Sequence, residues 1–155
     1  MSEASEGVGE PMVDSSRKAD ALAALETVPL FSSLTKRQLN SIASTAAERT
    51  YKAGETIVKQ GDKGIGFYLL LDGNADVLKS GQRVGAVHQG QFFGEMALLE
   101  EQPRTAEVRA SDLCHCLVLS RWEFWGAVGK DPEVLRALLT ETVRRLRAPG
   151  PGLSE

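Results

Sequence analysis

The stretch QFFGEMALLEEQPRTA, residues 91–106, decides how the centre of this chain folds. It connects an apolar run that ends at Val87 to another that begins at Ala106, and its composition is not that of a hairpin loop. Gly94 permits a close approach of the backbone, and residues 95–99 are good helix formers. The stretch therefore predicts a helix of one or two turns inserted between two strands.

On both sides of this stretch, the sequence has the rhythm of short, closely spaced strands. Glycine-bearing turns such as Asp72-Gly73 and Ser80-Gly81 separate apolar and β-branched runs. The expected strands are Thr56 to Val58, Phe67 to Leu71, Ala75 to Leu78, Val84 to Val87, Ala106 to Ala110 and Leu113 to Leu119. This spacing indicates a β-sandwich, a jelly roll or a barrel.

Apolar residues at helical spacing predict helices before and after the strands. Thr35 is the expected N-cap of a helix that ends near Glu48, and Ser120 that of a helix over 121–128. A last helix should start at Asp131, with Pro132 in its first turn. The expected organisation is a disordered tail (1–16), N-terminal helices (17–47), a β-roll (48–119), C-terminal helices (120–147) and a flexible tail (148–155).

Length and composition exclude several classes of protein. A chain of 155 residues with 42% hydrophobic and 25% charged residues has the size and composition of one globular domain. Its net charge of -3 argues against the basic surface that nucleic-acid binding requires. The apolar runs are too short to cross a bilayer, and the acidic N-terminus lacks the pattern of a secretory signal. We therefore expect a cytoplasmic protein with no nucleic-acid partner and no membrane insertion.

The residues of the 91–106 stretch point to a particular chemistry. Backbone amides at the start of the short helix could form an anion site, and Arg104 could direct a planar, charged fork at the same point. A phosphate suits such a site. Glu95 would repel a phosphate, so it should instead accept a hydrogen bond from a neighbouring hydroxyl, such as that of a ribose.

FGEMA at 93–97, followed by PRTA at 103–106, resembles the phosphate-binding cassette of cyclic-nucleotide-binding domains. The resemblance includes QGDKG at 60–64 and Phe67-Tyr68, and it covers about Pro29 to Arg147. It implies an antiparallel, eight-stranded β-roll or jelly roll, mainly β, with N-terminal helices, a short phosphate-binding helix and two C-terminal helices. Ile65-Gly66 departs from the family pattern, which should alter a turn more than the pocket.

The resemblance also implies roles for individual residues. Glu95 would bind the ribose 2′-hydroxyl, and Arg104 would bind the cyclic phosphate with help from the amides of the short helix. Val77 and Val87 would face the nucleotide, and Arg145 matches an arginine that contacts the base in some members. The expected ligand-binding set is Gly94, Glu95, Met96, Ala97, Arg104, Thr105, Ala106, Val77, Val87 and Arg145. Thr105 does not decide between cAMP and cGMP.

The expected function is that of a regulatory sensor, in which the helix from Asp131 to Arg147 closes over the base and a protein effector responds in trans. Pro149 should end this helix, so we expect a stand-alone form without a DNA-binding or catalytic domain. An enzyme is not expected, because nucleophile and Walker motifs are missing from the sequence. A domain that kept the fold as a ligand-free scaffold is the alternative.

No metal site is expected from the sequence either. His88 and His115, the two histidines, lie far apart in the chain. Cys114 and Cys116 should be reduced and buried, because a disulfide between two residues this close in a probable strand is geometrically awkward. Zinc bound with the help of His115 is the alternative, but strand alternation sends His115 to the opposite face from both cysteines.

Overall fold

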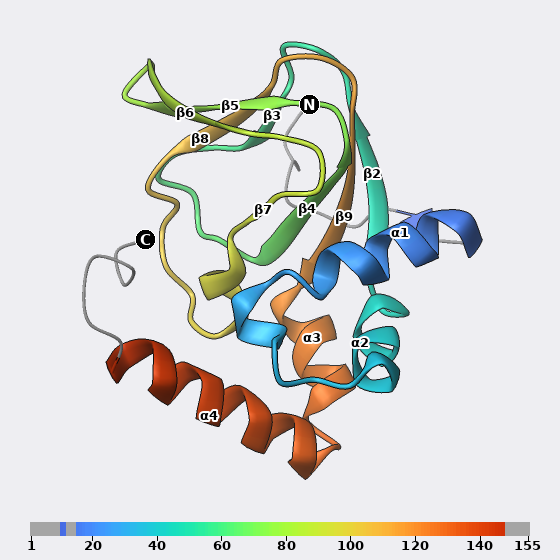
Figure 1. Ribbon diagram of the computed structural model, residues 1–155. Helices are drawn as coiled ribbons and strands as arrows, with labels where there is room; N and C mark the ends of the chain where they lie inside the picture. Colours follow the sequence, from blue (N-terminus) through green and yellow to red (C-terminus); the bar gives the residue numbers. More distant parts are fainter. Residues whose placement is uncertain (1–9, 12–14, 148–155) are drawn as a thin grey trace.

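The computed structural model describes residues 10–11 and 15–147. The strands form a roll, and the helices gather at one end of it (Figure 1). The strands are β1 (Glu10–Pro11), β2 (Ala47–Tyr51), β3 (Thr56–Val58), β4 (Gly66–Asp72), β5 (Ala75–Lys79), β6 (Gln82–Val87), β7 (Phe92–Phe93), β8 (Glu107–Ala110) and β9 (Cys114–Ser120). The helices are α1 (Ser15–Leu25), η1 (Pro29–Phe31), α2 (Lys36–Ala43), η2 (Glu95–Leu98), α3 (Arg121–Val128) and α4 (Pro132–Arg147), of which η1 and η2 are 3₁₀ helices.

Two antiparallel sheets make up the roll. Their strand orders are β1-β2-β9-β4-β7 and β3-β8-β5-β6. The predicted antiparallel β-roll with flanking helices is confirmed, with β2 to β9 as its eight strands and the two-residue β1 as an addition at one edge.

Strand β4 shows why both faces of the first sheet need apolar residues. Phe67 and Leu69 point to one face, where they pack with Phe31 and Phe124 from the helices. Tyr68 and Leu70 alternate with them and point into the roll. Because helices cover one face and the second sheet covers the other, β4 reads as a nearly uninterrupted apolar run.

Capping residues fix where two of the helices begin. The Thr35 hydroxyl accepts a hydrogen bond from the backbone N–H of Gln38, and the Gln38 side chain accepts one from Thr35 N–H. Ser120 and Glu123 form the same reciprocal arrangement at the start of α3. Both predicted N-caps are confirmed, and each satisfies amides that have no partner within the helix.

The structure corrects several predicted boundaries. The helix after Thr35 ends at Ala43, not near Glu48, because residues 47–51 pair with β9 as strand β2. Strand β7 pairs with β4 and was missed because two residues carry no periodicity. The predicted tail over 1–16 is also interrupted, since Glu10–Pro11 pairs with β2 and α1 begins at Ser15.

Both cysteines lie inside the roll as predicted. Cys114 and Cys116 are fully buried free thiols, and His115 between them is half-buried, with its ring Nδ1 3.2 Å from the Thr50 hydroxyl. Burial raises the pKa of the Cys116 thiol to about 12 and also raises that of Cys114. Such thiols are inert packing groups at neutral pH.

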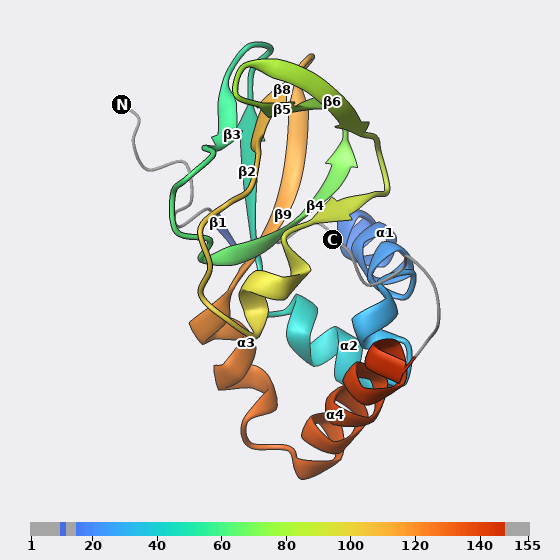
Figure 2. The ribbon, with the colours of Figure 1, turned by 90° about the vertical axis from the view of Figure 1, so that its left-hand side faces the viewer.

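Helix α4 lies apart from the strands. It packs on η1 and α3, with Val134, Leu138 and Glu141 buried. Figure 2 shows α4 beyond α2, away from the roll. No helix in the described part of the chain is long and apolar enough to cross a membrane.

Candidate functional site

In the 91–106 stretch, the short strand β7 is followed directly by a tight turn at Gly94 and by the helix η2. Phe93 pairs with Tyr68 in the sheet, and the two rings stack with their centroids 5.0 Å apart. Gly94 follows with φ of 82°, a left-handed conformation that favours glycine, and η2 starts at the next residue. The predicted short helix is therefore present as a 3₁₀ turn that carries Glu95 at its first position.

The loop that carries Arg104 is hydrogen-bonded to the loop between β3 and β4. Its backbone N–H donates to Asp62 O at 2.7 Å, and Gly61 N–H donates to Arg104 O at 2.8 Å. A further bond, from Gly64 N–H to Gln102 O at 2.9 Å, holds the two loops side by side. The backbone around Arg104 is thus fixed by residues about forty positions earlier in the chain.

The Arg104 guanidinium is packed among glycines. Its Nη2 donates to Gly66 O at 2.7 Å, and its Cζ lies 5.7 Å from the centroid of the Tyr68 ring. A methyl group on Gly94 would lie 2.5 Å from Nη1, and one on Gly64 would lie 3.1 Å from both Cζ and Nε. Contacts below 3.0 Å essentially never occur at a real Cβ, so a side chain at 94 would require the guanidinium tip or the backbone to shift.

Glu95 directly follows Gly94, the glycine that the Arg104 guanidinium approaches. Its side chain is buried, with 9% of its surface exposed. A carboxylate in such a place stays only if it is hydrogen-bonded, and it can accept hydrogen bonds from hydroxyl groups. Arg104 offers a planar donor fork suited to phosphate oxygens. Donors suited to an anion and an acceptor suited to a hydroxyl thus lie on two residues that both adjoin Gly94.

The remaining residues predicted in this stretch differ in position. Met96 is half exposed, and Ala97 is buried with its N–H donated to Gly94 O at 3.0 Å. The Ala97 amide is therefore engaged within η2 in this structure. Thr105 is exposed and Ala106 half-buried, and both precede β8, which begins at Glu107 and not at Ala106 as predicted.

Two predicted apolar positions lie on the second sheet. Val77 pairs with Gly85 and Val108, and Val87 pairs with Ala75. Both belong to the cluster inside the roll that contains Tyr68 and Phe93. Arg145 lies in α4, but its side chain is outside the described residues.

Sequence reasoning missed the part played by the loop between β3 and β4. Ile65-Gly66 was expected to affect a turn more than the site, whereas the Gly66 carbonyl accepts directly from Arg104. Tyr68 was recognised only as part of a motif, yet its ring lies near the guanidinium. A carbonyl contact leaves no trace in side-chain identity, so the sequence held no signal for the role of Gly66.

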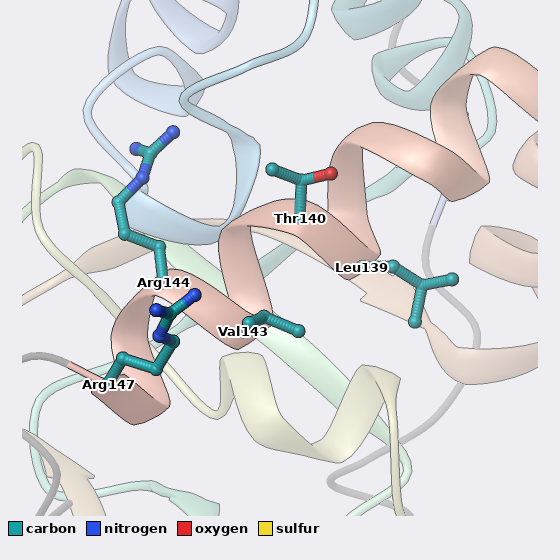
Figure 3. Close-up of a pocket in the computed structure, with 5 residues that line it drawn as sticks. All are labelled: Leu139, Thr140, Val143, Arg144 and Arg147. Carbon is teal, nitrogen blue, oxygen red and sulfur yellow. The ribbon is translucent and has the colours of Figure 1, made fainter.

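A cavity of about 510 Å³ lies along α4. Figure 3 shows its described lining, which is Leu139, Thr140, Val143, Arg144 and Arg147, all on α4. Leu139 is 65% exposed, Val143 47% and Leu146 67%, so an apolar stripe of α4 faces outward. Within the described residues, no group of three or more His, Cys, Asp or Glu side chains could hold a metal ion.

Comparison with known proteins identifies related sequences. The family model described as Cyclic nucleotide-binding domain matches residues 48–131. A cGMP-dependent protein kinase of Plasmodium berghei is 35% identical over 122 residues, which are 78% of this chain and 14% of that protein. The cAMP-dependent protein kinase regulatory subunit of Aspergillus niger is 39% identical over 114 residues, 72% of this chain and 28% of the subunit. The chain thus spans less than a third of either relative.

Solved structures agree with these matches. The N-terminal domain of a transcriptional regulator from Streptomyces coelicolor superposes with a TM-score of 0.75 at 28% identity, covering 82% of this chain and 99% of that one. The regulatory domain of Toxoplasma gondii PKA with cAMP gives a TM-score of 0.64 at 27% identity, covering 82% of this chain and 51% of that one.

Proposed function

Because the chain belongs to the cyclic nucleotide-binding domain family, we propose that it is a regulatory sensor that binds cAMP or cGMP and catalyses no reaction on it. The observation that carries the proposal is the junction at Gly94. There the Arg104 guanidinium packs against the residue that precedes the buried carboxylate of Glu95. A cation for the phosphate and an acceptor for a ribose hydroxyl are thus held together by two loops and one helical turn.

In this proposal each residue has a separate task. Arg104 binds the cyclic phosphate, and Glu95 accepts a hydrogen bond from the ribose 2′-hydroxyl. Gly94 keeps space for the guanidinium, while Val77 and Val87 offer apolar contacts from the second sheet. The phosphate is surrounded by Met96, Ala97, Thr105 and Ala106. The Ala97 N–H donates to Gly94 O in this structure, so that hydrogen bond must break before the amide can donate to the ligand.

We assign the switch to α4. Its apolar stripe of Leu139, Val143 and Leu146 is largely exposed, which supports a second position in which the stripe is covered. The nucleotide base would be covered in that position, with Arg145 beside it. A ligand shifts such an equilibrium only through its different affinity for the two positions. A protein effector that recognises one position would complete the sensor.

Titration calorimetry with cAMP, cGMP and linear AMP tests the binding. We expect saturable binding of one or both cyclic nucleotides and weaker binding of AMP, whose phosphate carries more charge. At about one hundred times the dissociation constant, the ligand should add roughly 2.7 kcal/mol to the free energy of unfolding. No binding of either cyclic nucleotide would refute the proposal and leave a ligand-free scaffold as the function.

Glu95→Ala tests the assigned role of the carboxylate. Wild-type protein should prefer a cyclic ribonucleotide over its 2′-deoxy form, and the variant should lose that preference. Arg37→Ala, an exposed change on α2, is the control. An unchanged preference in Glu95→Ala would remove this residue from sugar recognition.

Closure of α4 can be measured as a distance. Spin labels at Thr140 and Val84 would occupy exposed positions on α4 and β6, outside the apolar stripe. The distance between them should shorten when nucleotide is added. A bound protein whose label distance equals that of the free protein would contradict closure.

A further inference from the structure

Arg121, the first residue of α3, contacts both segments that form the site. Its Nη1 donates to Ala97 O on η2 at 3.0 Å and to Gly64 O in the loop before β4 at 3.2 Å. Its backbone N–H donates to Ile65 O at 2.8 Å. The side chain is 18% exposed, so these bonds form mostly out of water. One residue therefore connects α3, the short helix and the glycine-bearing loop.

Trp125 adds a second bond one turn later on α3. Its indole N–H donates to Leu98 O at 2.7 Å, although 37% of the residue is exposed. Ala97 and Leu98 are at the C-terminal end of η2, where carbonyls lack partners within the helix. The two side chains of α3 thus supply donors to two consecutive carbonyls of η2.

The hydrogen bonds from Arg121 connect α3 to the residues that adjoin Arg104 and Glu95. Gly64, whose carbonyl accepts from Arg121, is one of the two glycines, with Gly94, against which the Arg104 guanidinium packs. Ala97, the other acceptor, belongs to the turn of helix that begins with Glu95. Glu101 also lies near, with a carboxylate oxygen 3.7 Å from Arg121 Nη2 and the other 3.3 Å from Lys63 Nζ.

We propose that Arg121 and Trp125 are positioning residues, which set the placement of Glu95 relative to Arg104 by holding η2 and the Gly64 loop on α3. This inference rests on the proposed function of the site. Arg121 is suited to the task because Nη1 of its rigid, planar guanidinium donates to two carbonyls at once, which an ammonium group on a flexible stem does less well.

Three variants of the full chain test the proposal. Arg121→Met keeps an apolar stem and removes the donors, Arg121→Lys keeps the charge, and Trp125→Phe removes only the indole N–H and part of the ring. Arg37→Met is a matched control for Arg121→Met at an exposed position. Cyclic nucleotide affinity is measured by calorimetry at a temperature where denaturation curves show each variant folded.

Arg121→Met should weaken binding by roughly tenfold or more, and Trp125→Phe by less, since a hydrogen bond from a charged donor is the stronger. Arg121→Lys should recover part of the loss. A merely structural role would lower the midpoint of denaturation and leave the affinity of the folded protein unchanged. That result for Arg121→Met would overturn the proposal.

Hydrogen exchange of the unliganded protein gives a readout that does not depend on nucleotide. Arg121→Met should speed exchange of amides in residues 61–66 and 95–100, while those of β4 and β9 keep their rates. Unchanged exchange in both segments would overturn the positioning role. If the wild-type protein binds no cyclic nucleotide, the proposed function fails, and the exchange result still decides whether α3 holds the two segments.

Discussion

Gly94→Ala is the change that most directly tests how the site is assembled. Alanine at φ of 82° should cost about 1–2 kcal/mol of folding free energy, because its Cβ approaches the following carbonyl. The new methyl group would also lie 2.5 Å from Arg104 Nη1 and 2.9 Å from Gly66 O. Something must therefore shift, and the guanidinium is expected to move because it is the end of a flexible side chain, whereas Gly66 O is backbone.

Gly81→Ala provides a matched control. Gly81 has φ of 85°, but a methyl group there would meet nothing within 4 Å. The two variants share the backbone strain, and only Gly94→Ala displaces Arg104. Denaturant unfolding should show a loss of about 1–2 kcal/mol in both. Any additional loss in Gly94→Ala reports the clash.

Binding of cyclic nucleotide should separate the two variants. A charge-assisted contact contributes about 1.5–3 kcal/mol, so displacing the guanidinium should weaken binding at least roughly tenfold by calorimetry. Gly81→Ala should bind like the wild type. In the double variant Gly94→Ala/Arg104→Ala, the two losses should not add, because both act through one side chain.

Two results would refute this reasoning. Gly94→Ala could bind within about twofold of Gly81→Ala, which corresponds to less than about 0.5 kcal/mol. Alternatively, the losses in the double variant could add in full. Either result would mean that the guanidinium does not need the space above Gly94.

The remaining predictions concern single side chains. Arg104→Ala should weaken cyclic nucleotide binding by about 1.5–3 kcal/mol, and wild-type affinity by calorimetry would exclude Arg104 from the site. Thr35→Ala should lower the free energy of unfolding by about 1 kcal/mol through loss of the helix cap, and unchanged denaturation would contradict the capping role. Cys116 keeps its proton in the folded state up to a pKa of about 12 and releases it near 9.0 when unfolded, so stability should fall as pH rises above 9. By pH 10 the loss should be roughly 1.4 kcal/mol relative to Cys116→Val, and equal pH profiles for the two proteins would argue against it.

The sequence determined those features that depend on neighbouring residues. Apolar alternation in β4 predicted its strand, and Thr35 and Ser120 predicted two helix starts because capping is decided within one turn. The 91–106 stretch predicted a short helix that starts near Glu95, and it singled out Glu95 and Arg104 as candidate binding residues. Prediction failed for β2 and β7, where the local sequence pattern is short or ambiguous. These segments are strands because each pairs with a strand distant in the sequence.

Only the tertiary structure decided how the candidate site is assembled. Arg104 is held by backbone bonds to Asp62 and Gly61, and its guanidinium by Gly66 O and the space at Gly94. The bonds from Arg121 and Trp125 likewise join segments far apart in the chain. Such contacts depend on backbone atoms and on distances across the fold. The order of residue types along the chain does not specify these backbone contacts or distances directly, so the contacts can be identified only from the tertiary structure.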